Sequence, residues 1–238
     1  MPTVLALDTA TAVCTLALSD GTRTSGRHER LERAHNRHIL RMLEEVLAGR
    51  LLQESVDLIA CGVGPGSFTG LRVAVSVAQG LAWAQALPVQ AFCSLEAQVY
   101  SAAARQLVQD GDWVLTTIDA QIDQVYWSWG RFSGSRFLPE GDPIISPPEA
   151  IDCDPAAGPL VMLGSGMAHL QRMPAMTAVA AREGSAVMID ITPEAAVMAE
   201  LFASGRLATA PIPAHALMPR YVQQDIGWKK LSEQKARG

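Results

Sequence analysis

The amino-acid sequence predicts an α/β protein built from two related lobes. Its 238 residues are 49% hydrophobic, enough for the core of one large domain or of two small ones. Short apolar runs of strand length alternate with longer segments whose apolar residues recur at helical spacing. The opening pattern of the chain, a strand ending in an acid and followed by a turn and a second strand, returns 111 residues later (119 − 8 = 111). Together these observations predict a duplicated α/β architecture.

The first half opens with a predicted β-hairpin. Residues Val4–Leu7 form an apolar run that ends at Asp8, and Cys14–Leu18 form the second strand. The Ser19–Gly21 segment is rich in turn-forming residues, and Arg23–Arg30 is compatible with a third, more polar strand. The hairpin therefore presents an acid at the end of its first strand.

Helices and strands then alternate up to the middle of the chain. Ala34–Ala48 is the first predicted helix, and Ile39, Leu40, Leu43, Val46 and Leu47 fall on one of its faces. The following elements are predicted in this order: a buried strand over Val56–Val63, a helix over Thr69–Leu87, a strand over Val89–Phe92 and a helix over Leu95–Val108.

The second half repeats the opening. Val114–Ile118 is a strand that ends in Asp119, and a turn over Ala120–Asp123 leads into a strand at Val125–Trp129. Two β-rich halves that each open with an acid-bearing hairpin are typical of the actin-like ATPase fold (ASKHA, RNase H-like). We expect an N-terminal lobe over residues 1–108 and a C-terminal lobe with its tail over residues 109–238.

The rest of the second half carries weaker signals. Pro143–Pro148 and Asp152–Pro159 have the composition of loops, and Leu160–Leu163 is a strand leading into Gly164-Ser165-Gly166. Thr192 is the expected N-cap of a helix that begins at Pro193. The tail from Lys229 onward is charged, and we expect it to be frayed.

Charge and cysteine content limit the possible functions. The net charge of −5 argues against a protein that binds nucleic acid by itself, because nucleic-acid binders generally carry a basic excess. None of the four cysteines forms a CxxC pair, so buried reduced thiols are favoured over disulfides or a zinc site. The start MPTVLALDTA lacks the pattern of a signal peptide, and polar residues interrupt the apolar stretch Leu71–Leu87. We therefore expect a cytoplasmic protein without membrane contact.

The segment GPGSFTGLR, residues 64–72, is the most distinctive part of the sequence. It is a glycine-rich turn between a strand and a helix start, where free amide groups favour an anion such as phosphate. On physical grounds alone, a tight strand-to-helix turn capped by Ser67 or Thr69 is the favoured explanation. The candidate nucleotide or phosphate contacts are Asp8, Thr9, Thr11, Gly64, Gly66, Ser67, Thr69, Arg72 and Asp119.

The two hairpin turns lack the glycines that would complete a phosphate cradle. They read Thr9-Ala10-Thr11-Ala12 and Ala120-Gln121-Ile122-Asp123. Without these donors, efficient phosphoryl transfer is not expected, and acids that merely cap turns are an equal alternative. His35 and His38, three positions apart on the first helix, are interpreted as surface histidines because no third ligand is near in sequence. We therefore assign no catalytic residue and no metal ligand.

The helix over residues 69–87 is apolar or small on several sides. Such a helix is either deeply buried or covered by a partner, and both readings stay open. In the second reading Ala74, Ala78 and Trp83 face a partner, and the stripe of Arg33, Arg37 and Arg41 on the preceding helix borders the interface. An ordinary solvated face is the alternative for the arginines.

Four segments in this order resemble the bacterial TsaB (YeaZ) family. They are LALDTATAVCTLAL, CGVGPGSFTGLRVAVSVAQGLA, IDAQIDQVYW and PRYVQQDIGWKK, of which GPGSFTGLR is the specific part. The related TsaD carries a pair of metal-binding histidines with three residues between them, whereas His35 and His38 have two residues between them. TsaD is also longer, so the resemblance favours TsaB.

The resemblance implies a non-catalytic subunit in the formation of threonylcarbamoyladenosine next to the tRNA anticodon. TsaB-like proteins form homodimers and pair with the transferase TsaD through helices of the N-terminal lobe, and the ATPase TsaE docks on the pair. By this resemblance tRNA is met only within the complex, and no cofactor is intrinsic, although ATP or ADP can lie at the complex interface. Two alternatives remain: an ATP-dependent phosphotransferase of the same fold, and a metallopeptidase.

Overall fold

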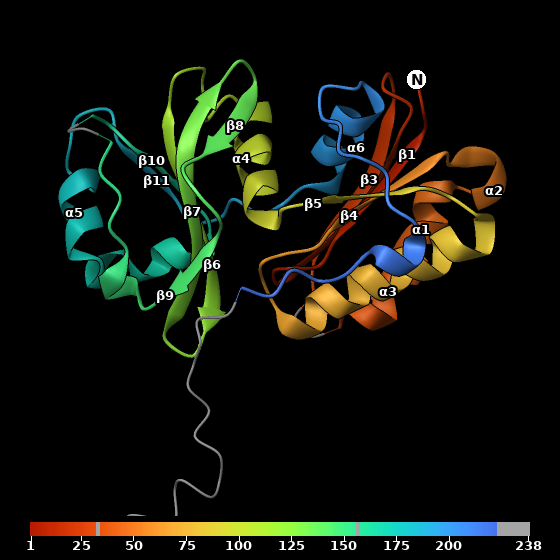
Figure 1. The fold of residues 1–238 in the computed structure, drawn as a ribbon, viewed down its shortest axis with the longest axis horizontal. Coiled ribbons are helices and arrows are strands. Elements are labelled where there is room, and N and C mark those ends of the chain that lie inside the picture. Colours follow the sequence, from red (N-terminus) through yellow and green to blue (C-terminus); the bar gives the residue numbers. More distant parts are fainter. Residues whose placement is uncertain (32–33, 156–157, 223–238) are drawn as a thin grey trace, which may run out of the picture.

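The computed structural model describes residues 1–31, 34–155 and 158–222 (Figure 1). Two β-sheets stand side by side, and helices α4 (Ser94–Ala104) and α6 (Ala195–Ala203) pack against each other between them. Helices α1 and α3 line the outer side of one sheet in the figure, and α5 lies beyond the other.

The first sheet has five strands in the order β3-β2-β1-β4-β5. Strand β1 (Val4–Asp8) pairs antiparallel with β2 (Val13–Ser19), which pairs antiparallel with β3 (Thr24–Arg30). On its other side β1 pairs parallel with β4 (Leu58–Gly62), which pairs parallel with β5 (Val89–Phe92). Both faces of β1 and β2 are buried, which explains their continuous apolar sequence.

Helices cover both faces of this sheet. Alternate strand residues such as Leu5 and Leu7 pack under α1 (His35–Leu47) and α3 (Phe68–Gln85), with the short α2 (Leu52–Ser55) between these helices in sequence. The intervening residues on the opposite face pack against α6. The period of two in the strands thus divides their side chains between two layers of helix.

The second sheet repeats the first in order and direction. Its strands β6 (Trp113–Gln121), β7 (Gln124–Ser133) and β8 (Arg136–Pro139) are antiparallel neighbours. Strand β6 also pairs parallel with β10 (Val161–Leu163), which pairs parallel with β11 (Ala186–Met188), giving the order β11-β10-β6-β7-β8. This repetition confirms the predicted duplicated α/β fold of the actin-like type.

The two halves exchange a helix. Helix α4 follows β5 of the first sheet but packs on β6 and β8 of the second. Helix α6 follows β11 of the second sheet but packs on β1, β2 and β3 of the first. The boundary between residues 108 and 109 stays a prediction, and the helix exchange ties the halves together across it.

Shorter helices complete the second half. Helix η2 (Ser165–Arg172) lies against β6, and α5 (Pro174–Ala180) packs beside it. Two single turns of 3-10 helix are η1 (Pro148–Ala150) and η3 (Ala214–Ala216). The segment around η3 returns to the first sheet, where Ile212 forms a bridge to Val89.

Three predictions about the elements are wrong in detail. The expected loop at 143–148 contains a strand, β9 (Ile144–Ser146), which is flanked by prolines and pairs with the beginning of β7. Helix α4 ends at Ala104 instead of Val108. Strand β6 continues through Asp119 to Gln121, so the acid lies inside the strand.

The start of α6 also differs from the prediction. The helix begins at Ala195, and Thr192 does not cap it. Instead, the amide of Ala195 donates a hydrogen bond to Thr15 Oγ1, and the amide of Glu194 donates one to Ser101 Oγ. Side chains from distant strands and helices therefore satisfy the free amides that a local cap would satisfy.

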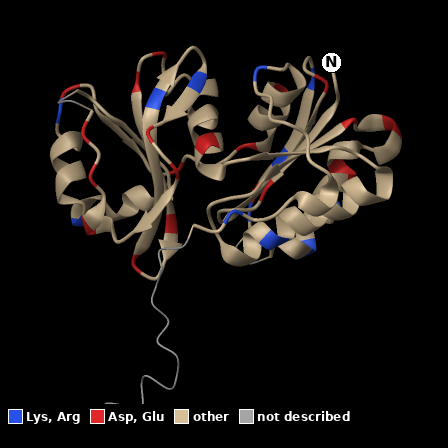
Figure 2. Ribbon diagram, viewed as in Figure 1, with Lys and Arg blue, Asp and Glu red and all other residues tan. Residues whose placement is uncertain are grey.

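Surface charges are mixed, with acidic and basic positions interspersed over both halves (Figure 2). In the described part of the chain, no helix combines the length and apolar character needed to cross a membrane. The expected fray from Lys229 onward lies outside the described residues, as do residues 223–230 of the PRYVQQDIGWKK segment.

Candidate functional site

Asp8, at the end of β1, is enclosed by three elements of the protein. The residue is 1% exposed. Oδ1 accepts a hydrogen bond from the amide of Ala10 (2.7 Å), and Oδ2 accepts one from Ser94 Oγ at the start of α4 (2.6 Å). A Cβ atom on Gly62 would lie 1.9 Å from Oδ2, so the end of β4 seals the third side.

Burial raises the pKa of the Asp8 carboxyl to about 6, although the hydrogen bonds from Ser94 and Ala10 oppose the shift. Each of the two carboxylate oxygens accepts a hydrogen bond from within the chain. The acid thus holds the junction of β1, β4 and α4 together.

The glycine-rich loop packs directly onto the hairpin turn. The amide of Ser67 donates to the carbonyl of Ala10 (2.7 Å), and Thr9 Oγ1 donates to the carbonyl of Gly70 (2.7 Å). A Cβ atom on Gly66 would lie 2.4 Å from the carbonyl oxygen of Ala10, and one on Gly70 would lie 2.0 Å from that of Thr9. The absence of a side chain at these glycines lets the backbone of the glycine-rich loop contact the backbone of the hairpin turn. This contact lies where the sequence suggested a phosphate site.

The remaining candidates around this loop have local roles. Ser67 Oγ accepts a hydrogen bond from the amide of Gly70 (3.3 Å) and so caps α3. Thr11 Oγ1 accepts from the amide of Val13 (3.1 Å) in the hairpin turn, and Gly64 has the positive φ of +106°. Thr69 is exposed on the first turn of α3. Phosphate contact by these residues remains a prediction.

Arg72, near the start of α3, contacts two aromatic side chains. Its guanidinium carbon lies 3.7 Å from the centre of the Phe68 ring, and its Nε donates to Tyr221 Oη (3.0 Å). The Phe68 and Tyr221 rings are themselves 5.3 Å apart. Arg72 therefore anchors the segment that ends the described chain onto α3.

Asp119 occupies the equivalent hairpin of the second half but is open to solvent, with a side chain that is 37% exposed. Its Oδ1 accepts from the amide of Gln121 (2.9 Å) and lies 3.5 Å from His169 Nε2. Its own amide donates to Ser165 Oγ (3.0 Å), at the start of η2.

The structure shows which residues of α3 are buried in the protein and which are exposed. Ala74 and Ala78 are fully buried against the first sheet, where their small side chains let the helix approach closely. The prediction that these two alanines face a partner is therefore wrong. The outer face of α3 carries Arg72, Ser76, Gly80 and Trp83, of which Trp83 is 74% exposed.

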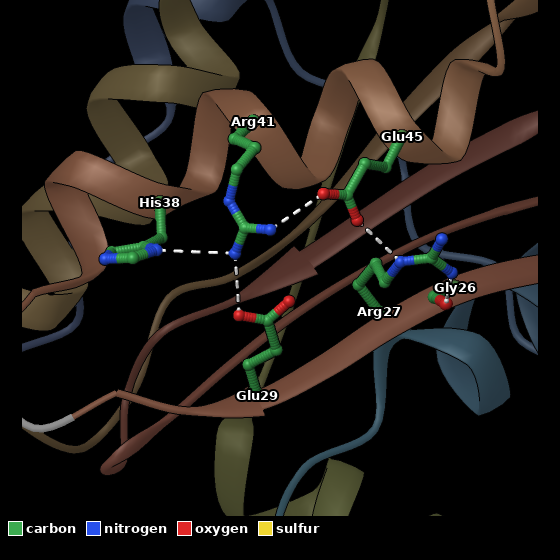
Figure 3. A network of polar contacts seen from close by, with 6 residues as sticks. All are labelled: Gly26, Arg27, Glu29, His38, Arg41 and Glu45. Carbon is green, nitrogen blue, oxygen red and sulfur yellow. Dashed lines mark hydrogen bonds and ion pairs between the residues drawn. The ribbon is translucent and has the colours of Figure 1, made fainter.

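The arginines of α1 differ from one another (Figure 3). Arg37 is exposed, whereas Arg41 donates to Glu45 (2.7 Å) and to Glu29 on β3 (2.9 Å). Arg27, also on β3, pairs with the second oxygen of Glu45 (2.7 Å). Arg33 lies outside the described residues. Arg41 therefore belongs to a charge network that joins α1 to the edge strand.

Two other expectations on α1 are wrong. His35 is buried, with Nε2 3.0 Å from the carbonyl oxygen of Thr11, and burial lowers its pKa. Leu40 was placed with the apolar face but is 54% exposed. A stricter helical projection separates Leu40 from Ile39 and Leu43, which are buried, so this signal was present in the sequence.

Sequence reasoning missed Ser94 altogether. Its hydroxyl reaches Asp8 across 86 residues of chain, and it is fully buried. A serine at the first turn after a strand is common, so nothing local distinguishes it.

Comparisons with known proteins agree with this architecture. Residues 28–195 match the family model "TsaD: tRNA N6-adenosine threonylcarbamoyltransferase". The chain is 32% identical to the tRNA threonylcarbamoyladenosine biosynthesis protein TsaB of Haemophilus influenzae and 30% identical to that of Escherichia coli. Each alignment covers 96% of this chain and 97% of the relative.

Solved structures give the same result. A Pseudomonas aeruginosa protein described as similar to peptidase YEAZ superposes with a TM-score of 0.81 at 33% identity, covering 94% of this chain and all of that one. YeaZ from Pseudomonas aeruginosa superposes with a TM-score of 0.80 at 32% identity, covering 93% of this chain and all of that one.

Proposed function

The chain belongs to the TsaB family of tRNA threonylcarbamoyladenosine biosynthesis proteins, and from that premise we propose that it acts as a non-catalytic subunit supporting a TsaD-type transferase. The observation that carries the proposal is the closure of the Asp8 hairpin. An acid that helps phosphoryl transfer must reach a metal ion or a water beside the nucleotide. Here Ser94, Ala10 and Gly62 surround it instead.

The glycine-rich loop supports the same proposal. A phosphate cradle needs backbone amides that are free to donate to the ligand. The amide of Ser67 already donates to the carbonyl of Ala10, and the amide of Gly70 donates to Ser67 Oγ. The loop therefore contributes shape and rigidity to the first lobe.

The outer faces of α1 and α3 are the partner surface that we propose. They carry Leu40 and Trp83, large apolar side chains that are 54% and 74% exposed, together with Arg37. Exposed aromatic and apolar residues beside an arginine have the composition of a protein interface. The transferase would bind here, and in its absence a second copy of the chain would occupy the same surface.

The remaining assignments follow from the family. We propose that the protein works in the cytoplasm, that a TsaE-type ATPase joins the complex, and that tRNA is bound only through the complex. A nucleotide, if present, would lie at the complex interface and not in the closed hairpin of one chain.

The test is reconstitution of threonylcarbamoyl transfer. Purified TsaC-, TsaD- and TsaE-type proteins from one source are supplied with tRNA, threonine, bicarbonate and ATP, and the modified nucleoside is measured by mass spectrometry. We expect modification to depend on this protein and to survive Asp8→Asn. Loss of modification with folded Asp8→Asn would indicate an active nucleotide site, and no dependence on the protein would remove the proposal.

Variants of the surface separate docking from folding. Leu40→Asp and Trp83→Ala should weaken transferase binding by about tenfold or more without lowering the thermal stability, because both side chains are exposed. Ala74→Arg should instead unfold the protein, because Ala74 is in the core. Binding is measured by calorimetry, and unchanged affinity in both exposed variants would place the interface elsewhere. The matched control is Glu54→Gln, an exposed change on α2.

A further inference from the structure

A cavity of about 320 Å³ lies between the two halves of the protein, and none of the residues that line it contacts the Asp8 carboxylate. Its walls come from β5 of the first sheet, β8 of the second, the exchanged helices α4 and α6, and residues 207–209. This volume is in the range of small-molecule sites. A ligand held here would touch both halves of the chain.

One side of the cavity is apolar. The rings of Phe92 and Phe202 lie 6.2 Å apart, and Met198 and Leu207 extend the same wall. Phe92 and Phe202 also belong to the core cluster under α6, so packing fixes their positions. The wall is therefore preformed for an aliphatic or aromatic group.

Glu96 is the acidic group of the cavity, and within the described ranges no hydrogen bond or ion pair reaches its carboxylate. It projects from α4, between Cys93 and Tyr100 on the same side of the helix. Burial raises its pKa, with an opposing effect from Arg220. A half-buried carboxylate without a donor is costly, and a ligand ammonium group would relieve that cost.

Two arginines face the same cavity. Arg220 Nη2 donates to Asp142 (2.7 Å), whose side chain is 90% exposed, and such a pair on the surface is weak and exchangeable. Arg136 Nη2 donates to the carbonyl of Arg206 (3.2 Å). Two guanidinium groups on the cavity wall, of which Arg220 acts electrostatically on Glu96, disfavour a ligand with two positive charges and favour one that also carries a carboxylate.

We propose that this cavity binds a small zwitterion of the apolar α-amino acid class, with its ammonium on Glu96, its carboxylate on Arg220 and its side chain against Phe92 and Phe202. This site is separate from the proposed partner surface on α1 and α3, and it does not depend on the proposed function. By contacting both halves, the ligand stabilises one arrangement of the lobes and raises the unfolding temperature.

The experiment is calorimetry of the full chain with L-amino acids that have apolar side chains. For L-leucine, two molecules each lack one charge: 3-methylbutylamine has no carboxylate, and 4-methylpentanoate has no ammonium. We expect an apolar amino acid to bind and both single-charge molecules to bind more weakly. Failure of every apolar amino acid to bind at millimolar concentration would overturn the proposal, as would equal affinity for the amine.

The variant Glu96→Gln tests whether Glu96 binds the ammonium group of the ligand. It should weaken amino-acid binding by about tenfold or more, because a charge-assisted contact is lost while the shape of the site is kept. The matched control Glu54→Gln should leave the affinity unchanged. Thermal unfolding checks that both variants are folded. Unchanged binding in folded Glu96→Gln would overturn the assignment.

Discussion

The two acid-bearing hairpins share one local hydrogen bond but differ in their turns and in their surroundings. Asp8 and Asp119 each accept a hydrogen bond from the amide two residues later, at 2.7 Å and 2.9 Å. Yet Asp8 is buried, whereas the Asp119 side chain is 37% exposed. The repeated sequence pattern therefore reproduced this hydrogen bond of the acid, and other parts of the chain set its environment.

Strand register explains the difference. Leu7 is paired with Cys61 on the neighbouring parallel strand, so Asp8 lies beside Gly62 at the very end of β4. In the second sheet the last pair is Thr116 with Leu163, which leaves Asp119 three residues beyond it. Strand β6 thus carries its acid past the edge of β10 and into solvent, where His169 and Ser165 contact it.

The largest expected effect on stability comes from adding a side chain at Gly62, where the backbone lies against Asp8. Gly62→Ala places a methyl group on the Asp8 carboxylate, and we expect a loss of about 4 kcal/mol in the free energy of unfolding. Urea unfolding followed by circular dichroism measures it. The control Gly80→Ala has no neighbour within 4 Å on α3 and should be neutral or slightly stabilising. Equal stabilities of the two variants would mean that β4 does not seal the hairpin.

The next effect is a pH dependence from Asp8. Its pKa is raised from 3.8 to about 6 in the folded protein, so the folded state holds the proton more tightly than the unfolded state. The resulting stability is fully present below about pH 4 and is lost as the pH rises through about 6, a change of about 3 kcal/mol.

Urea unfolding is measured from pH 3.5 to pH 7.5 in steps of about one pH unit. The change is the difference in the free energy of unfolding between the wild type and Asp8→Asn. Asp119→Asn is the matched control, because its side chain occupies the equivalent position in the exposed hairpin. A constant difference between wild type and Asp8→Asn across this range would show that the Asp8 carboxyl is not buried.

Ser94→Ala tests the contact between β1 and α4. The change removes the hydroxyl that donates to Asp8 Oδ2 in a buried site, and we expect a loss of about 2 kcal/mol. The pKa of Asp8 should also rise further, because Ser94 opposes its upward shift. Both are read from the same pH series. A loss within about 0.5 kcal/mol, together with an unchanged pH midpoint, would contradict the contact.

Asp119→Ala should have the smallest effect. Its hydrogen bond to the amide of Gln121 and its contact with His169 are open to solvent, so we expect a loss below about 1 kcal/mol. Asp8→Ala under the same conditions should cost about 2 kcal/mol more, because buried donors lose their acceptor. Similar losses in the two variants would remove the distinction between the hairpins.

Much of the architecture could be predicted from local patterns. The apolar runs of β1 and β2, the helical spacing in α1 and the recurrence of Asp8 at Asp119 were sufficient to predict the duplicated fold. The end of α4 and the strand β9 were not predicted, because apolar residues of the 105–108 segment and the prolines around residues 143–148 give ambiguous signals.

The candidate site was less predictable, because its residues meet through tertiary packing. Trp83 is exposed while Ala74 and Ala78 are buried on the same apolar helix, and composition alone left both readings open. Arg41 was expected at a partner interface but is paired with Glu29 and Glu45. Which side of a helix meets the sheet depends on its rotation against strands far away in sequence.

The sequence by itself determined most of the strands and the recurrence of an acid late in the first strand of each half, because these depend on neighbours within a few residues. Only the tertiary structure decided that Asp8 would be closed in by Gly62 and Ser94 while Asp119 remained open. The reason is that burial depends on the register between β1 and β4 and between β6 and β10, strands joined by long crossovers whose relative position no local pattern specifies.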